Sequence, residues 1–160
     1  MIYNKFRTIL IDDKLKLIPF YLSKDYKSTM LKSYQDDFGV RMMDGRSESH
    51  YDYKTMMNMY NYLNNNGYLF MIYYDNCSVG DISIIKNSEI AIFIDANYRR
   101  KYIAKRASKA IFDFAKSIGI KELFTTVYSF NKSSFKLCRS LGMKIKSKSK
   151  DEYIFIKKFN

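Results

Sequence analysis

The sequence predicts an α/β fold, with a mixed, mostly antiparallel sheet of about six to seven strands flanked by about four helices. Apolar residues recur at helical spacing within 24–63 and then form β-branched and aromatic runs over 68–94. An amphipathic segment at 103–118 lies between two apolar runs, which predicts one right-handed β-α-β connection. With 160 residues, 47% hydrophobic content and one Pro, the chain is expected to form a single domain, residues 1–160.

The first part of the chain is predicted to hold two short strands followed by two helices. The strands are β-rich runs separated by an Asp-Asp-Lys turn. Ser23 is the expected N-cap of the first helix, and the Asn-rich turn before Gly67 ends the second. The expected elements are strands over 6–11 and 15–20 and helices over 24–34 and 53–63.

The rest of the chain is predicted to alternate between strands and helices. Three β-rich runs divided by turn residues predict a meander of antiparallel hairpins. An amphipathic helix, a strand, a short helix and a final hairpin follow. The expected elements are strands over 68–74, 79–85 and 89–94, a helix over 103–118, a strand over 123–127, a helix over 132–141 and a hairpin formed by 143–148 and 153–159.

The junction between the strand ending at Ile94 and the following helix is strongly basic, with five cations within residues 99–106. The first turn of a helix leaves backbone N–H groups unpaired at the positive end of the macrodipole, so an anion fits there. Cations at that end oppose the macrodipole, at a cost of about 0.3–1 kcal/mol each. A bound anion would offset this cost, which favours a phosphate site. The alternative is the solvated basic face of an ordinary surface helix.

The positive charge is confined to the second half of the chain. Residues 97–150 contain 15 Lys or Arg against 2 Asp or Glu, whereas residues 1–96 contain 11 against 12. Such a field attracts polyanions, so a nucleotide-bearing cofactor, a nucleic acid and an anionic membrane surface are all candidate partners. Charge alone does not rank them.

Cysteine and histidine usage narrows the chemistry. Cys77 and Cys138 are the only cysteines and lie far apart in the sequence, which favours a reducing, cytoplasmic location over a disulfide framework. His50 is the sole histidine, so a multi-histidine metal site is excluded, and in its polar stretch a surface position is expected. No apolar run approaches the ~20 residues that cross a bilayer.

The chain resembles the GNAT superfamily of acyl-CoA-dependent N-acetyltransferases over roughly residues 15–158. The resemblance lies in the order of its elements: a strand, an Arg-rich turn, a helix, a strand and then the segment 131–143. Within this superfamily, the branch with ribosomal-protein and small-molecule acetyltransferases is most similar. The family's phosphate turn has the pattern Arg or Gln, two residues of any type, Gly, one residue of any type, then Gly or Ala. In this chain the three defined positions of that pattern fall on Arg99, Tyr102 and Ala104. With Tyr102 in place of glycine, we expect either a shifted cofactor or a side chain turned outward from ordinary helical backbone angles.

A second family signature falls on Asn131, Ser134, Leu137 and the segment 141–143. The resemblance implies an acceptor-side strand and helices at 14–66, a central sheet with the phosphate-binding helix at 68–128, and a C-terminal helix and hairpin at 131–160. It implies acetyl-CoA as co-substrate and no metal. The implied cofactor-binding residues are Phe93, Ile94, Arg99, Arg100, Lys101, Tyr102, Ile103, Ala104, Lys105, Asn131 and Ser134.

The resemblance also implies that the strands ending at Ile94 and Val127 diverge, with pantetheine between them paired to the backbone near Phe93 and Ile94. A backbone N–H there would polarise the thioester carbonyl. The amine acceptor must lose a proton, and Glu89 at the start of the central strand is the candidate base; a solvent-facing glutamate is the alternative.

The leaving thiolate is commonly protonated by a tyrosine that, by the family pattern, would occupy position 138. This chain has Cys138 there, so the thiol is a candidate acid, with a buried, inert cysteine as the alternative. Tyr128, just past a strand end, could substitute.

The acceptor wall implied by the family is the segment 34–60, which is rich in Met and aromatic residues and suits an apolar or aromatic amine or a peptide N-terminus. These residues could equally be core; they include Phe38, Met42, Met43, His50, Tyr51 and Tyr53. Two other classes stay open: a catalytically silent acyl-CoA-binding protein, and a basic nucleic-acid-binding domain. No membrane partner is expected, and both a monomer and a homodimer fit.

Overall fold

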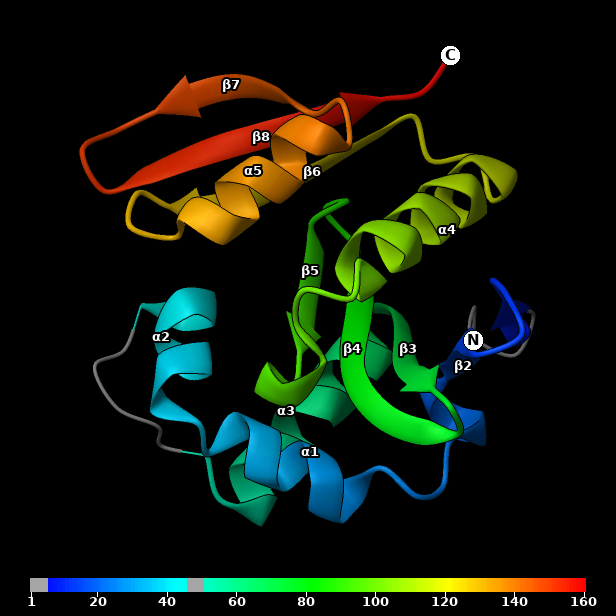
Figure 1. Cartoon of the computed structure of the whole chain (residues 1–160). Coiled ribbons are helices and arrows are strands. Elements are labelled where there is room, and N and C mark those ends of the chain that lie inside the picture. Colours follow the sequence, from blue (N-terminus) through cyan, green and yellow to red (C-terminus); the bar gives the residue numbers. More distant parts are fainter. Residues whose placement is uncertain (1–5, 46–50) are drawn as a thin grey trace.

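The structure, a computed structural model, describes residues 6–45 and 51–160. Its strands form two antiparallel sheets (Figure 1), one of five strands in the order β1-β2-β3-β4-β5 and one of three in the order β6-β8-β7. The strands are β1 (Ile9–Leu10), β2 (Leu15–Pro19), β3 (Gly67–Tyr74), β4 (Cys77–Ile85), β5 (Ile90–Ile94), β6 (Glu122–Tyr128), β7 (Lys144–Lys148) and β8 (Glu152–Lys158). The predicted α/β class is confirmed.

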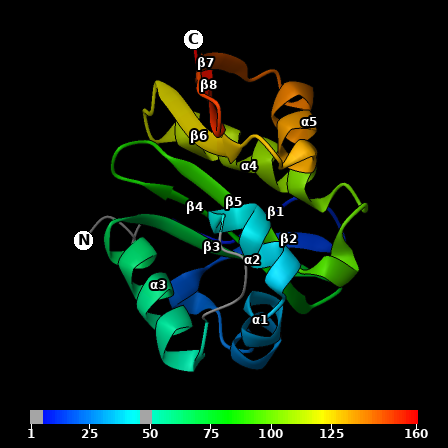
Figure 2. The same cartoon turned by 90° about the vertical axis from the view of Figure 1, so that its left-hand side faces the viewer.

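The α-helices of the described chain are α1 (Lys27–Tyr34), α2 (Asp37–Asp44), α3 (Tyr53–Asn65), α4 (Ile103–Ser117) and α5 (Lys132–Ser140). Short 3-10 turns, η2 (Phe20–Leu22) and η3 (Ala96–Tyr98), follow β2 and β5. In Figures 1 and 2 the second sheet and α5 lie beyond β5, at the end of the molecule opposite α1 and α3. No helix of the described chain is both long and apolar enough to span a membrane.

The five-stranded sheet separates two apolar cores because side chains alternate between its faces. Phe70 and Ile72 of β3 pack with the apolar side of α4, in a core that also reaches β6, β8 and α5. Leu69 and Met71, the neighbours of Phe70, point to the other face and pack with α1 and α3. The sheet is therefore covered by α4 on one face and by α1 and α3 on the other.

Three local expectations from the sequence differ from the structure. The strand expected over 6–11 is only β1, because Phe6 turns its ring into the core against Phe70, 4.9 Å away between ring centroids. Ser23 does not cap a helix: its hydroxyl is hydrogen-bonded to that of Tyr73 at 2.5 Å, and α1 begins at Lys27. The third difference is α2, a helix that the expected elements did not include.

Candidate functional site

The two sheets meet at one end of β5 and β6 and diverge from there. Within the described residues, a single parallel bridge between Glu89 and Phe124 joins these strands, and the Phe124 N–H donates to the Ser88 carbonyl at 3.0 Å. Beyond the bridge, among residues 6–45 and 51–160, β5 pairs only with β4 and β6 only with β8. The expected divergence of the strands ending at Ile94 and Val127 is thus present, as a gap that opens toward the ends of β5 and β6.

The backbone of β5 faces this gap at alternate residues. The Ile85 N–H donates to the Glu89 carbonyl and the Asp95 N–H to the Val79 carbonyl, so odd-numbered residues pair with β4. Phe93 belongs to this set, and its buried ring stacks on Tyr34 with 4.3 Å between centroids. The backbone groups of Ile92 and Ile94 point the other way, into the gap. Of the two expected residues, Ile94 rather than Phe93 therefore has its backbone N–H directed toward the gap.

The turn between β5 and α4 adopts backbone angles that glycine favours, although it contains none. Arg100 has φ of 66° and Tyr102 has φ of 57°. Tyr102 is 76% exposed, so its side chain does turn outward. The expected ordinary helical angles at Tyr102 are wrong, because the residue is left-handed with ψ of 19°. The turn thus adopts, without a glycine, the left-handed backbone angles that glycine favours.

The N-terminus of α4 is uncapped, since Tyr102 stands at the N-cap with no side-chain hydrogen bond. The first intrahelical bond runs from the Arg106 N–H to the Tyr102 carbonyl at 3.1 Å. The three preceding N–H groups, those of Ile103, Ala104 and Lys105, therefore have no acceptor within the helix. This end of α4 is the arrangement that holds a phosphate.

The basic side chains of the turn divide into two groups. Arg100 and Lys101 are exposed, Lys105 is half-buried, and none of the three has an ion pair or side-chain hydrogen bond within residues 6–45 and 51–160. Arg106 pairs with Asp12 of the β1–β2 turn. Arg99 turns away from α4, donating from Nε to the Ile94 carbonyl at 3.2 Å. The structure thus leaves three cations for an anion at α4, with Arg99 at the end of β5.

Replacing Tyr102 with glycine is expected to raise the free energy of unfolding by about 0.5–1 kcal/mol, because relief of a left-handed strain of about 1–2 kcal/mol outweighs the added flexibility of the unfolded chain. Urea unfolding measures the change. Tyr62→Gly is the control, since Tyr62 is an exposed tyrosine in α3 and its loss should destabilise. Equal destabilisation by both variants would contradict the expectation.

The second group of expected cofactor residues lies at the start of α5. The Asn131 side chain caps this helix, its Oδ1 accepting from the Ser134 N–H at 3.1 Å. Its Nδ2 donates to the Met42 carbonyl of α2 at 2.9 Å. Asn131 is buried and Ser134 is half-buried. The carboxamide thus makes contacts inside the protein at both ends.

The three candidate catalytic residues lie in different surroundings. Glu89 is half-buried at the closed end of the gap, on the same side of β5 as Ala91 and Phe93. Tyr128 is at the open end, its ring stacked on Phe130 with 5.4 Å between centroids. Cys138 is on the buried side of α5 and faces the core, and burial raises the pKa of its thiol to about 11. These positions favour Glu89 and Tyr128 over Cys138 for proton transfer.

A buried carboxylate that the sequence reasoning missed lies beneath the acceptor-side helices. Asp81 of β4 is 5% exposed, and its Oδ2 accepts hydrogen bonds from Tyr34 Oη at 2.6 Å and Tyr60 Oη at 3.0 Å. Burial raises the pKa of Asp81 to about 6, and the two hydroxyls partly oppose this rise. Burial and the neighbouring carboxylate hold the pKa of both tyrosines well above the usual value. Asp81 pairs with Phe93 across β4 and β5, one strand from the gap.

The acceptor wall expected from the sequence is partly core and partly surface. Met43 and Tyr51 pack against the core that contains Tyr34, whereas Phe38 and Tyr53 are exposed. Met42 supplies the carbonyl that Asn131 holds. His50 lies outside the described residues. Among the described residues, no group of three or more His, Cys, Asp or Glu side chains is placed to hold a metal ion.

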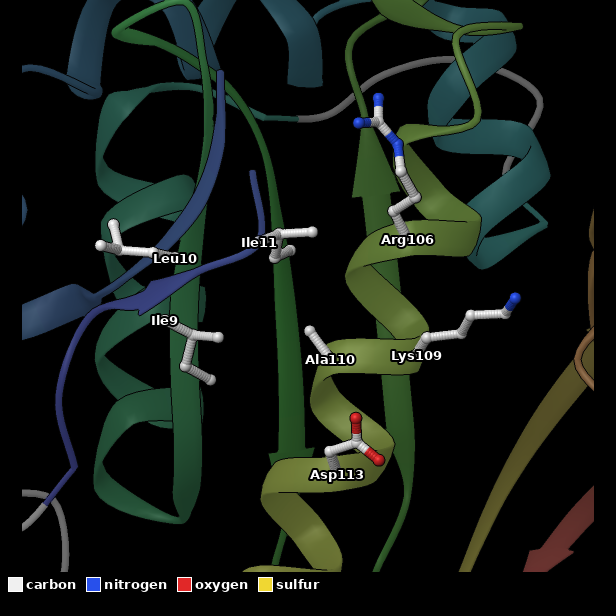
Figure 3. A pocket seen from close by; sticks show the side chains of 7 residues that line it. All are labelled: Ile9, Leu10, Ile11, Arg106, Lys109, Ala110 and Asp113. Atoms are coloured by element: carbon white, nitrogen blue, oxygen red, sulfur yellow. The ribbon is translucent and has the colours of Figure 1, made fainter. Parts of the chain in front are cut away.

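Two shallow grooves lie elsewhere on the surface. The larger, about 360 Å³, runs between β1 and α4 (Figure 3) and is lined by Ile9, Leu10, Ile11, Arg106, Lys109, Ala110 and Asp113. The other, about 320 Å³, lies on the second sheet around Phe124 and Ile154. The first groove includes Arg106, but neither groove is lined by Ile103, Ala104 or Lys105 at the start of α4.

Comparisons with solved structures show the same fold. RimL, a ribosomal L7/L12 alpha-N-protein acetyltransferase solved with coenzyme A, superposes with a TM-score of 0.79 at 11% identity, covering 96% of this chain and 98% of that one. The microcin C7 self-immunity acetyltransferase MccE, solved with acetyl-CoA and AMP, gives 0.71 at 16% identity, covering 93% and 94%. A domain from Methanocaldococcus jannaschii gives 0.77 at 19% identity, covering 92% and 100%.

The sequence itself matches one family model. A search of curated protein sequences finds no match. The model described as an acetyltransferase (GNAT) domain matches residues 14–144, which span the acceptor-side helices, the gap and the basic turn between β5 and α4. The chain therefore belongs to the GNAT acetyltransferase family.

Proposed function

We propose that this protein is an acetyl-CoA-dependent N-acetyltransferase, which transfers the acetyl group to a primary amine by direct attack on the thioester. One observation carries the proposal: the gap between β5 and β6 opens beside a helix N-terminus that has no side-chain cap and three cations without an ion pair among the described residues. The strand edge at Ile92 and Ile94, together with a helix end suited to phosphate, supports this proposal. The acetyl-CoA that MccE binds and the coenzyme A that RimL binds have both parts, an amide-bearing arm and phosphates.

In this proposal the chain's own residues divide the work between binding and chemistry. The N–H groups at the start of α4, with Arg100, Lys101 and Lys105, hold the pyrophosphate. The N–H groups of Ile92 and Ile94 pair with the pantetheine arm and polarise the thioester carbonyl. The amine nitrogen then forms a bond to the carbonyl carbon, the C–S bond breaks, and the thiolate leaves.

Two proton transfers accompany that step. We assign the amine proton to Glu89, through water, because its side chain lies on the acceptor side of β5 and is partly exposed. We assign protonation of the thiolate to Tyr128 at the open end of the gap rather than to the buried Cys138. The acceptor is a small-molecule amine or a protein N-terminus, the class on which RimL acts.

Acetyl-CoA binding tests the proposal first. Calorimetric titration at two salt concentrations, with dephospho-CoA and a short DNA duplex as comparison ligands, should give micromolar binding of acetyl-CoA. Arg100→Ala combined with Lys101→Ala should weaken that binding about tenfold, because two charge-assisted contacts are lost. Lys146→Ala with Lys148→Ala, on the exposed strand β7, is the charge-matched control. Salt-dependent binding of DNA without binding of acetyl-CoA would establish the nucleic-acid alternative instead.

Glu89→Gln is expected to lower kcat by about 100-fold with a primary amine acceptor, since a positioned general base contributes about 10²–10⁴. Acetyl-CoA affinity should stay unchanged, because Glu89 precedes the first residue of β5, whereas the first turn of α4 follows the other end of that strand. A screen of small amines and peptide N-termini supplies the acceptor, and Glu122→Gln, a half-buried glutamate on β6, is the control. Binding of acetyl-CoA with no turnover of any amine would identify a silent acyl-CoA-binding protein.

A further inference from the structure

Helix α2 bridges the open end of the gap on the acceptor side, with one end on each strand. Its first turn contacts the β5 side. A Cβ on Gly39 would stand 2.8 Å from Arg99 Nη2 and 3.2 Å from the Phe93 ring, so the helix backbone approaches both side chains closely here. Asp36, the N-cap, comes within 3.8 Å of Arg99 Nη2, and the same guanidinium lies 5.7 Å from the Phe38 ring centroid. Both figures that show the whole chain place α2 near β5.

The last turn of α2 contacts the β6 side. The Met42 carbonyl accepts from Asn131 Nδ2 at 2.9 Å, and the Arg41 guanidinium lies 5.4 Å from the Phe130 ring centroid. Gly45, which ends the helix at φ of +79°, packs against Tyr128, whose ring would be 3.2 Å from a Cβ there. The two ends of α2 thus hold the two diverging strands at one spacing.

We propose that Asn131 is a positioning residue that acts through α2: its carboxamide fixes this helix across the gap, and α2 keeps water from the acceptor side of the reacting end. This inference rests on the proposed function, because it assigns a task around the same site. Three observations carry it: the Asn131–Met42 hydrogen bond, the close packing at Gly39 and Gly45, and the burial of Val40 between them.

The two ends of the Asn131 carboxamide make different contacts, so different substitutions can test them separately. Its Oδ1 caps α5 and its Nδ2 holds α2. Asn131→Ser keeps a capping oxygen and adds no charge, but serine lacks the amide donor and is too short to reach Met42. Asn131→Ala removes both contacts. The serine variant therefore tests the contact with α2 alone, and the alanine variant tests both.

Hydrogen exchange gives the first measurement, without any ligand. In Asn131→Ser, the amides of α2 should exchange about two- to tenfold faster, as the loss of one neutral hydrogen bond predicts, while those of α5 stay unchanged. In Asn131→Ala, both helices should exchange faster. Asn61→Ser, on an exposed position of α3, is the control and should change neither. Unchanged exchange of α2 in Asn131→Ser would overturn the inference.

Slow hydrolysis of acetyl-CoA gives a second readout, which mere loss of structure would not raise. Water adds to the thioester carbonyl, the C–S bond breaks, and acetate, a proton and free coenzyme A thiol result. Asn131→Ser should hydrolyse bound acetyl-CoA about two- to tenfold faster than the wild type, because a looser α2 admits water. Loss of thioester absorbance follows the reaction.

The acetyl-CoA affinity of Asn131→Ser distinguishes a failure of this inference from a failure of the proposed function. With Asn131 as a positioning residue, acetyl-CoA affinity in Asn131→Ser stays within about threefold of the wild type. A loss of affinity beyond tenfold with α2 unchanged would make Asn131 a cofactor ligand, and hydrolysis at the wild-type rate would remove the shielding role of α2. Failure of the wild type to bind acetyl-CoA would reject the proposed function, while the exchange result would still judge the contact with α2.

Discussion

Gly80→Ala is expected to destabilise the protein by about 3 kcal/mol or more, because the added methyl group meets backbone rather than a movable side chain. A Cβ on Gly80 would stand 2.2 Å from the Phe93 carbonyl oxygen and 3.3 Å from Ile94 Cα, so β4 and β5 must separate to admit it. That separation displaces the end of β5 whose backbone faces the gap. We therefore expect a loss of acetyl-CoA affinity as well, measured by titration at a temperature where urea unfolding shows the variant folded.

Substitutions at two other glycines show whether a loss of acetyl-CoA affinity comes from the position of Gly80 or from a general loss of stability. Gly67→Ala makes the same kind of clash, 2.0 Å from the Ile84 carbonyl oxygen, but at the closed end of the sheet. It should lower stability and spare acetyl-CoA affinity in the folded fraction. Gly119→Ala has open space around it and φ of +88°, so it should lose only the left-handed preference, about 1 kcal/mol. Equal affinities in the folded Gly80 and Gly67 variants would show that the end of β5 does not contact the cofactor.

Asp81→Asn is expected to change the pH dependence of stability by about 2 kcal/mol between pH 4 and pH 7. In the folded protein the pKa of Asp81 is raised to about 6, from 3.8, chiefly by burial. The folded state thus binds the proton more tightly than the unfolded state. The stability that this group contributes is present below about pH 4 and is lost as the pH rises through 6.

Asparagine removes this titration and keeps an oxygen that accepts hydrogen bonds from Tyr34 and Tyr60. The free energy of unfolding of the variant should therefore increase relative to that of the wild type as the pH rises. Urea unfolding at several pH values measures this difference. Asp12→Asn is a control of opposite sign, because the N–H groups of Lys14 and Leu15 lower the pKa of Asp12. A difference between wild type and Asp81→Asn that is constant from pH 4 to pH 8 would show that Asp81 has no raised pKa.

Local sequence patterns were sufficient for the elements with strong periodicity. The run 68–74 became β3 with one residue added, and the amphipathic segment after Tyr102 became α4. Helix α2 was missed although Asp36 at its N-cap and Gly45 after its end are ordinary boundary signals. Gly39 in its middle weakens the helical pattern, and its close approach to Arg99 and Phe93 is visible only in the structure.

The site was predicted less completely, because its side chains are positioned by contacts between distant segments. The basic turn could be located from its cations, but whether Arg99 joins them depends on Ile94 and Asp36. Asp81 gave no signal, since its burial follows from tyrosines 47 and 21 residues away in the sequence. Asn131 was expected from the family signature, yet its contact with Met42 joins residues 89 apart.

The gap between β5 and β6 also bears on association between molecules. An unpaired strand edge is a template for another chain, and this fold keeps two of them in its centre. They face each other across the gap, with α4 packed on one side and α2 on the other. A foreign strand would have to displace one of these helices before it could pair. The two helices that flank the gap therefore also shield these edges from aggregation.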